Sequence, residues 1–159
     1  MLKFLKKNCN IMSPISGKIM DLKDVPDKVF AEKMAGDGVA IFTYGDMVLA
    51  PADGIISIIF KSNHAVGMTL NNGVEILIHI GIDTVELEGS GFTRLIEEGK
   101  KVKGGDPIIK IDRKFIIEKG YSLITPVLIT NTELIKDIDV NIGADVKAGE
   151  DILMTYRTK

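Results

Sequence analysis

The chain has 159 residues, a formal net charge of −2 and 26% charged residues. A chain of this length hides about 70% of the surface that it exposes when unfolded, which suffices for one well-formed core. The slight acidic excess, the lack of Trp and the aromatic content of 6% exclude a typical nucleic-acid-binding protein, which needs basic surface and stacking side chains.

The chain begins with a short basic segment. Residues 1–7 read MLKFLKK, and no apolar region of signal-peptide type follows them. We predict that residues 1–11 form a basic tail before a single domain of residues 12–159. An amphipathic surface anchor is the alternative, so membrane association is expected to be peripheral at most. Cys9, the only cysteine, excludes a disulfide within the chain and fits the reducing cytoplasm.

Turn-forming residues divide the rest of the chain into short segments. They cluster at 16–17, 36–38, 44–46, 53–54, 71–73, 89–91 and 104–105. Runs rich in Val and Ile lie between them, and such short β-branched runs are typical of an all-β sandwich or barrel. Only residues 92–98 and 132–136 are predicted to form a helical turn or two.

Two pairs of segments resemble each other. Residues 14–19 resemble 51–56, and residues 102–109 resemble 146–153. Each segment has the pattern of a turn that leads into a strand. The echoes suggest a sheet built from two similar half-motifs, although they fall short of a repeat array.

Lys33 lies between Glu32 and Met34 in a segment expected to connect two strands. This arrangement is similar to the lysine hairpin of biotinyl and lipoyl carrier domains. A carrier domain modified at Lys33 is therefore the alternative function that we keep open.

The two histidines of the chain are expected to meet in space. Asn72-Gly73 predicts a two-residue hairpin loop, because both central residues of a type I′ turn need positive φ. That loop makes His64 and His79 diagonal neighbours on one face, whereas a loop of Asn71-Asn72 makes them face each other. A three-residue loop would put them on opposite faces.

Alternation along the second strand of this hairpin predicts where His79 points. Successive side chains of a strand face opposite sides of the sheet. The core face is expected to carry Val74, Ile76, Ile78 and Ile80. His79 then lies on the outer face with Leu77 and Glu75.

Two neighbouring imidazoles suit phosphoryl transfer. A neutral imidazole is a competent nucleophile at pH 7 and can form a covalent phosphoryl intermediate. A second imidazole could hydrogen-bond the phosphoryl oxygens. Two histidines alone are too few for zinc, and Asp or Glu would have to supply the other ligands. We expect no metal.

The chain also resembles the glucose-family enzyme IIA of the bacterial phosphoenolpyruvate-dependent sugar phosphotransferase system, from about Met12 to the C-terminus. The segments that carry the resemblance are SPISGKI, VPDKVFAEKMAGDGVAI, LAPADGII, SNHAVGMTLNNGVEI and LIHIGIDTVELEGSGF. The resemblance implies an antiparallel β-sandwich with barrel character and a cytoplasmic phosphocarrier that needs no cofactor.

The resemblance also implies roles for individual residues. His79, in the HxGIDTV motif, would accept the phosphoryl group on Nε2 from the carrier protein HPr and pass it to a cysteine of an enzyme IIB domain. His64 would stabilise the phosphoryl group, and Ser62 would orient His64. The docking surface implied for these partners comprises Asp27, Val29, Phe30, Phe60, Leu77, Asp83 and Val85. Regulatory partners are expected to bind through the same face.

Overall fold

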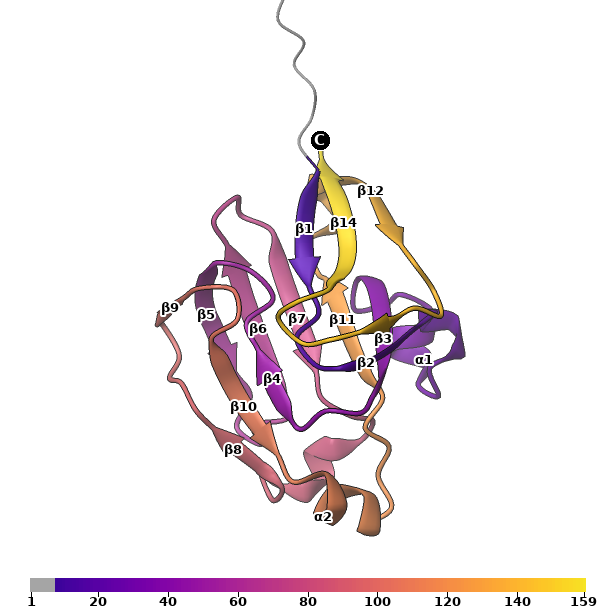
Figure 1. The fold of residues 1–159 in the computed structure, drawn as a ribbon, viewed down its shortest axis with the longest axis vertical. Helices are drawn as coiled ribbons and strands as arrows, with labels where there is room; N and C mark the ends of the chain where they lie inside the picture. The colour runs from indigo at the N-terminus through magenta and orange to yellow at the C-terminus, as the bar shows by residue number, and fades with distance from the viewer. Residues whose placement is uncertain (1–7) are drawn as a thin grey trace, which may run out of the picture.

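The computed structural model describes residues 8–159, which form mainly antiparallel strands (Figure 1). The largest sheet contains, in spatial order, β13 (Asp145–Val146), β2 (Gly17–Met20), β3 (Asp37–Thr43), β11 (Thr125–Ile129), β7 (Glu75–His79), β6 (Ala65–Leu70), β5 (Gly54–Ile59) and β9 (Lys101–Val102). Adjacent strands pair antiparallel throughout this sheet.

Two smaller antiparallel sheets complete the strand structure. One contains β1 (Cys9–Met12), β14 (Ile152–Thr158) and β12 (Ile135–Val140). The other contains β4 (Met47–Leu49), β10 (Pro107–Ile111) and β8 (Phe92–Arg94). The architecture confirms the predicted all-β class and antiparallel sandwich.

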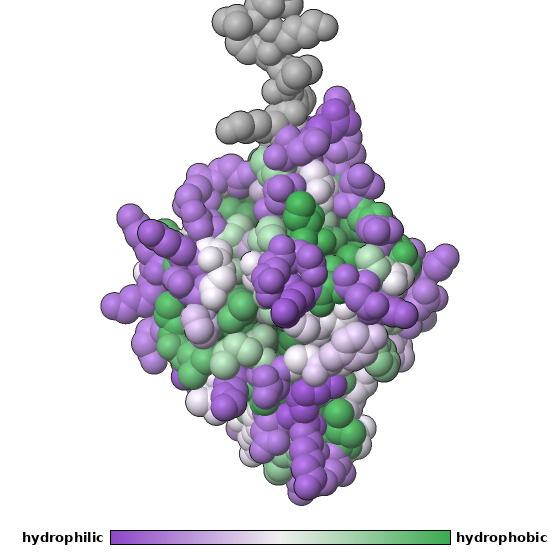
Figure 2. Space-filling view, viewed as in Figure 1, coloured by the Kyte–Doolittle hydropathy of each residue, from purple (hydrophilic) through white to green (hydrophobic). Residues whose placement is uncertain are grey.

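One core lies between the large sheet and the two small ones. It contains Ile41, Met68 and Ile78 from the large sheet, with Ile109 and Met154 from the small sheets, and all five side chains are buried. The small sheets lie in front of the large one in Figure 1. Figure 2 shows hydrophilic side chains around smaller apolar patches on this front face.

A second, smaller core lies on the outer face of the large sheet. Leu22, Val25 and Phe30 pack there against Ala40 and Leu128. Leu22 belongs to a 3₁₀ turn, Leu22–Asp24, and Phe30 to the short helix α1 (Lys28–Ala31), which begins where the Asp27 side chain accepts a hydrogen bond from the Val29 N–H. The α1 segment therefore covers part of the face towards which His79 points.

The helices differ from the sequence prediction. Residues 92–98 were predicted to be helical, but Phe92–Arg94 is strand β8, paired with β10. Phe92 is buried and Leu95 is 44% exposed, so these two residues, three apart, do not share the buried face that a helix would give them. The prediction for residues 132–136 is correct only for the 3₁₀ turn Thr132–Leu134, because β12 begins at Ile135.

The sequence reading missed α1, the six-residue helix α2 (Arg113–Glu118) and the 3₁₀ turn Thr84–Leu87. All of these are too short to show a helical period. In residues 8–159 no helix has both the length and the apolar character that a bilayer crossing demands.

The predicted boundary of the basic tail is too late. Residues 9–11 belong to β1, which pairs with β14, and the Ile11 side chain is fully buried. Burial of Ile11 and the hydrogen bonds to β14 hold residues 9–11 in the strand. The basic composition of the preceding residues gave no sign of this strand. Residues 1–7, to which the tail and surface-anchor predictions mainly refer, lie outside the described residues.

The Ile78 side chain gives a direct test of this core assignment. Replacing Ile78 with Ala should lower the free energy of unfolding by about 2–5 kcal/mol, because the change removes buried methyl groups and leaves a cavity. Ile58→Ala is the matched control, since Ile58 is 46% exposed on a neighbouring part of the sheet. Urea unfolding of both variants measures the difference, and equal losses would contradict the assignment.

Candidate functional site

His79 lies at the end of β7, in the interior of the large sheet. Ile76 and Ile78 are buried in the main core, whereas Leu77 and His79 are half-buried on the opposite face. The predicted alternation is thus correct. The sheet fixes the backbone of His79 while the outer face leaves its imidazole accessible.

The predicted hairpin register is wrong. Ala65 pairs with His79, and the Leu70 N–H donates to the carbonyl of Val74, so the loop has three residues, 71–73. A long-range contact favours this loop: the Asn72 side chain donates to the Tyr156 hydroxyl, at 2.9 Å, and accepts from the Val74 N–H. Local turn preferences do not reveal a contact with β14.

The two histidines nevertheless meet, because His64 lies outside strand β6. It follows Asn63, whose φ of 55° is left-handed, and this bend frees His64 from the alternation that the register would impose. Its carbonyl accepts a hydrogen bond from the Ile80 N–H at 2.7 Å. The backbone of His64 is thereby fixed beside the end of β7.

The two imidazoles form the centre of a row of four rings. Their centroids are 5.0 Å apart and the rings meet edge to face at 83°. Phe30 contacts His79 at a centroid distance of 4.8 Å, and Phe60 contacts His64 at 5.6 Å. The aromatic neighbours limit the directions in which each imidazole can turn.

A hydrogen bond sets the tautomer of His79. Its Nδ1 lies 2.7 Å from the carbonyl oxygen of Gly81, and because a carbonyl only accepts, Nδ1 carries the proton. In the neutral imidazole, Nε2 then holds a free lone pair. Gly81 has a φ of 84°, and a Cβ atom there would approach the Ser122 carbonyl to 2.7 Å, so this turn requires glycine.

Burial keeps both imidazoles neutral near pH 7. It lowers the pKa of His64 from the usual 6.5 to about 4, with a smaller contribution from the charge of His79. Burial also lowers the pKa of His79, although the Gly81 hydrogen bond and the carboxylates of Asp27 and Asp83 oppose this shift. Both rings therefore have the protonation state that nucleophilic chemistry needs.

The expected hydrogen bond between Ser62 and His64 is not present. His64 is 4% exposed, and its Nδ1 is the one buried side-chain nitrogen or oxygen in residues 8–159 that lacks a hydrogen-bond partner. Ser62 is half-buried in the loop between β5 and β6. The sequence motif placed the two residues close together but did not determine which way the hydroxyl points.

The predicted docking residues divide into exposed and supporting ones. The side chains of Val29, Phe60 and Val85 are 45%, 39% and 50% exposed. Leu77 is half-buried and packs against the second core. Phe30 is only 6% exposed: it packs in the second core and contacts the ring of His79, so its direct contact with a partner stays a prediction.

The two predicted acidic residues have different local roles. Asp27 accepts the Val29 N–H and so caps α1. Asp83 is exposed, has a left-handed φ of 59° and makes no capping hydrogen bond at the turn Thr84–Leu87. Sequence reasoning missed Thr84, which is fully buried and donates to the carbonyl of Ile80, thereby fixing the turn after His79.

Lys33 does not occupy the tip of a β-hairpin. It follows α1 in a turn with a φ of 57°, and its ammonium group lies 3.2 Å from a carboxylate oxygen of Asp37. The alternative of a biotinyl or lipoyl carrier domain is not supported.

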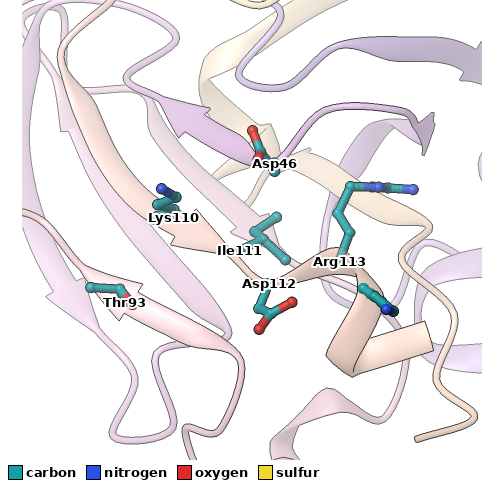
Figure 3. A pocket seen from close by; sticks show the side chains of 7 residues that line it. Asp46, Thr93, Lys110, Ile111, Asp112 and Arg113 are labelled. Carbon is teal, nitrogen blue, oxygen red and sulfur yellow. The ribbon is translucent and has the colours of Figure 1, made fainter. Parts of the chain in front are cut away.

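A separate polar hollow of about 540 Å³ lies beside β10 and the start of α2 (Figure 3). Its charged groups stabilise local structure: Asp112 caps α2, and Arg113 donates to Thr43 and to the carbonyl of Gly45. No histidine lines this hollow.

Within residues 8–159 no group of three His, Cys, Asp or Glu side chains is arranged to hold a metal ion.

The lowered pKa of His64 predicts a specific loss of stability in mild acid. As the pH falls from about 6.5 towards 4, the unfolded chain binds a proton at His64 before the folded protein does, so this histidine destabilises the fold in that window and not above it. Urea unfolding should therefore show a steeper loss for the wild type than for His64→Gln between pH 6.5 and about 4. Parallel curves would contradict the assigned burial.

Comparison with known proteins shows the family to which the chain belongs. Residues 9–135 match the family model described as phosphoenolpyruvate-dependent sugar phosphotransferase system, EIIA 1. The glucose-specific EIIA component of Haemophilus influenzae is 46% identical over 147 residues, covering 92% of this chain and 88% of that protein. The N-acetylglucosamine-specific EIICBA component of Klebsiella pneumoniae is 42% identical over 150 residues, covering 94% of this chain and 23% of that longer protein.

A solved structure gives the same result. The glucose permease IIA from Mycoplasma capricolum superposes with a TM-score of 0.88 at 36% identity, covering 97% of this chain and 99% of that one. The family match extends over most of the chain and includes both histidines. The chain belongs to the EIIA 1 family of the phosphoenolpyruvate-dependent sugar phosphotransferase system.

Proposed function

We propose that this phosphocarrier accepts a phosphoryl group from phospho-HPr on Nε2 of His79 and passes it to a cysteine of an EIIB domain, in the cytoplasm. The observation that carries the proposal is the bond from Nδ1–H of His79 to the carbonyl of Gly81, which leaves Nε2 as the available nucleophile. The relative from Klebsiella pneumoniae, whose name joins components C, B and A, supports an EIIB domain as the acceptor.

The transfer is a pair of displacements at phosphorus. The Nε2 lone pair of His79 forms the new P–N bond as the P–N bond to the histidine of HPr breaks. Nδ1 of His79 keeps its proton, and the ring becomes positively charged. Its hydrogen bond to Gly81 then becomes charge-assisted and stronger, which stabilises the intermediate. In the second step a cysteine thiolate of EIIB forms the P–S bond as the P–N bond to His79 breaks, and the electron pair of that bond returns to Nε2, so His79 is neutral again.

His64 stabilises the phosphoryl group on His79. Its ring lies 5.0 Å from that of His79, within reach of a group attached there. With a pKa of about 4, His64 is neutral before the reaction and does not repel the imidazolium that forms on His79. Ser62 is proposed to orient His64 once the site is loaded, because its hydroxyl can supply the partner that Nδ1 lacks.

The surface around His79 suits protein partners. Val29, Phe60 and Val85 expose apolar area that docking would bury, while Leu77 packs against the second core and Phe30 contacts the ring of His79. The Asp83 carboxylate is exposed and makes no capping hydrogen bond, and both it and the Asp27 carboxylate lie near enough to affect the pKa of His79. These charges favour the approach of a basic HPr surface.

Replacing His79 with Ala tests the proposal. The variant should take up no phosphate from phosphoenolpyruvate, the general phosphotransferase enzyme and HPr, because no other residue of the site provides the nucleophile. Radiolabel incorporation and intact mass measure this. The wild-type product should be acid-labile and stable in mild base, as a phosphoramidate is. Lys33→Ala is the control and should be phosphorylated normally; label on the His79→Ala variant would refute the assignment.

Replacing His64 with Gln should separate the two transfer steps. His79 should still accept phosphate, because its own nitrogen attacks. Gln keeps a side-chain N–H donor but lacks the shape of the imidazole, so onward transfer should slow by about 10²–10³, the usual effect of losing one well-placed donor. Rapid-quench measurements of label moving from HPr to this protein, and then to EIIB, give both rates. Complete loss of uptake would mean instead that His64 is itself a nucleophile or is needed for folding.

A further inference from the structure

The loop that presents His64 adopts an uncommon backbone conformation. The Asn63 N–H closes a turn with the carbonyl of Phe60 at 2.7 Å, and Asn63 itself is left-handed, with a φ of 55°. Asn tolerates this region better than most residues but still has to be held there. In a continued strand, position 64 would lie on the side of Val66 and Ile78, away from His79. The bend at Asn63 therefore determines where His64 points.

A side chain from another sheet holds this bend. Nε of Arg94 donates to Oδ1 of Asn63 at 3.0 Å, and Arg94 is itself fixed in β8 by pairing with Ile109 of β10. Glu98, four residues later, accepts the Ile59 N–H just before the loop. Residues 94 and 98 thus hydrogen-bond the chain on both sides of the loop, at Asn63 and at Ile59.

We propose that Arg94 is a positioning residue for phosphoryl transfer: it holds Asn63 in the bend that brings His64 against His79. The proposal rests on the proposed role of His64. Arg94 contacts the loop through Asn63, and its guanidinium also forms an ion pair with Glu97 at 3.7 Å. That ion pair is exposed and weak, so the hydrogen bond to Asn63 is the contact that matters.

Arg94→Met tests the proposal, because Met keeps the apolar stem and removes the donor. Onward transfer to EIIB should slow about ten-fold, the factor that one hydrogen bond of ordinary strength supplies. Asn63→Gly should show a similar loss, since Gly adopts the left-handed bend but has no side-chain acceptor. Arg157→Met is the matched control: Nε of Arg157 donates to Asp137 on a small sheet, and its loss should leave transfer unchanged.

Two further measurements distinguish positioning from general support. In a His64→Gln background, Arg94→Met should cause no additional slowing, because its effect passes through His64. In the unphosphorylated protein, the ring ¹H–¹⁵N signals of His64 should shift in Arg94→Met and stay in place in Arg157→Met. Wild-type transfer rates in Arg94→Met, unmoved His64 signals, or a ten-fold loss that persists without His64 would each overturn the proposal.

The outcome also separates this proposal from the proposed function. If the wild type is phosphorylated on His79 and Arg94→Met transfers normally, only the role of Arg94 fails. If the His79→Ala variant still carries phosphate, the assignment of the nucleophile fails, whatever Arg94→Met does. The ring signals of His64 report on the bend without any phosphate present.

Discussion

The hydrogen bond between Nδ1–H of His79 and the carbonyl of Gly81 is the interaction on which the site depends. It requires the chain to turn back sharply after β7, and only glycine fits the turn. Thr84 secures the turn from the other side through its bond to Ile80. One short segment thus orients the imidazole, leaves Nε2 available and brings Asp83 beside it.

The electrostatics of the site combine two opposing requirements. Burial keeps both imidazoles neutral, which preserves the nucleophile, while Asp27 and Asp83 favour the charged form of His79. The two carboxylates leave His79 closer to protonation than burial alone would, and this would stabilise the positive charge that the proposed phosphorylation places on the ring. No carboxylate opposes the effect of burial on His64, and its pKa falls to about 4.

The sequence was informative where a pattern repeats along the chain and uninformative where a single distant contact decides. The alternation of Ile76 and Ile78 with His79 has a period of two, so the outward direction of His79 could be predicted. The loop length could not, because the contact from Asn72 to Tyr156 joins residues 84 positions apart. The left-handed bend at Asn63 could not be predicted from the sequence either, because its contact with Arg94 joins residues 31 positions apart. Two errors therefore cancelled. The predicted register was wrong, and the bend at Asn63, which was not predicted, brings the two imidazoles together all the same.

The exposed apolar side chains of Val29, Phe60 and Val85 imply a thermal property of the carrier. Burying such surface lowers the heat capacity of the complex, and this kind of attraction weakens on cooling. Donor and acceptor, docking on the same patch as proposed, would share that response. A fall in temperature would then weaken both encounters together, and the relative occupancy of the carrier by its two partners would change less than either affinity.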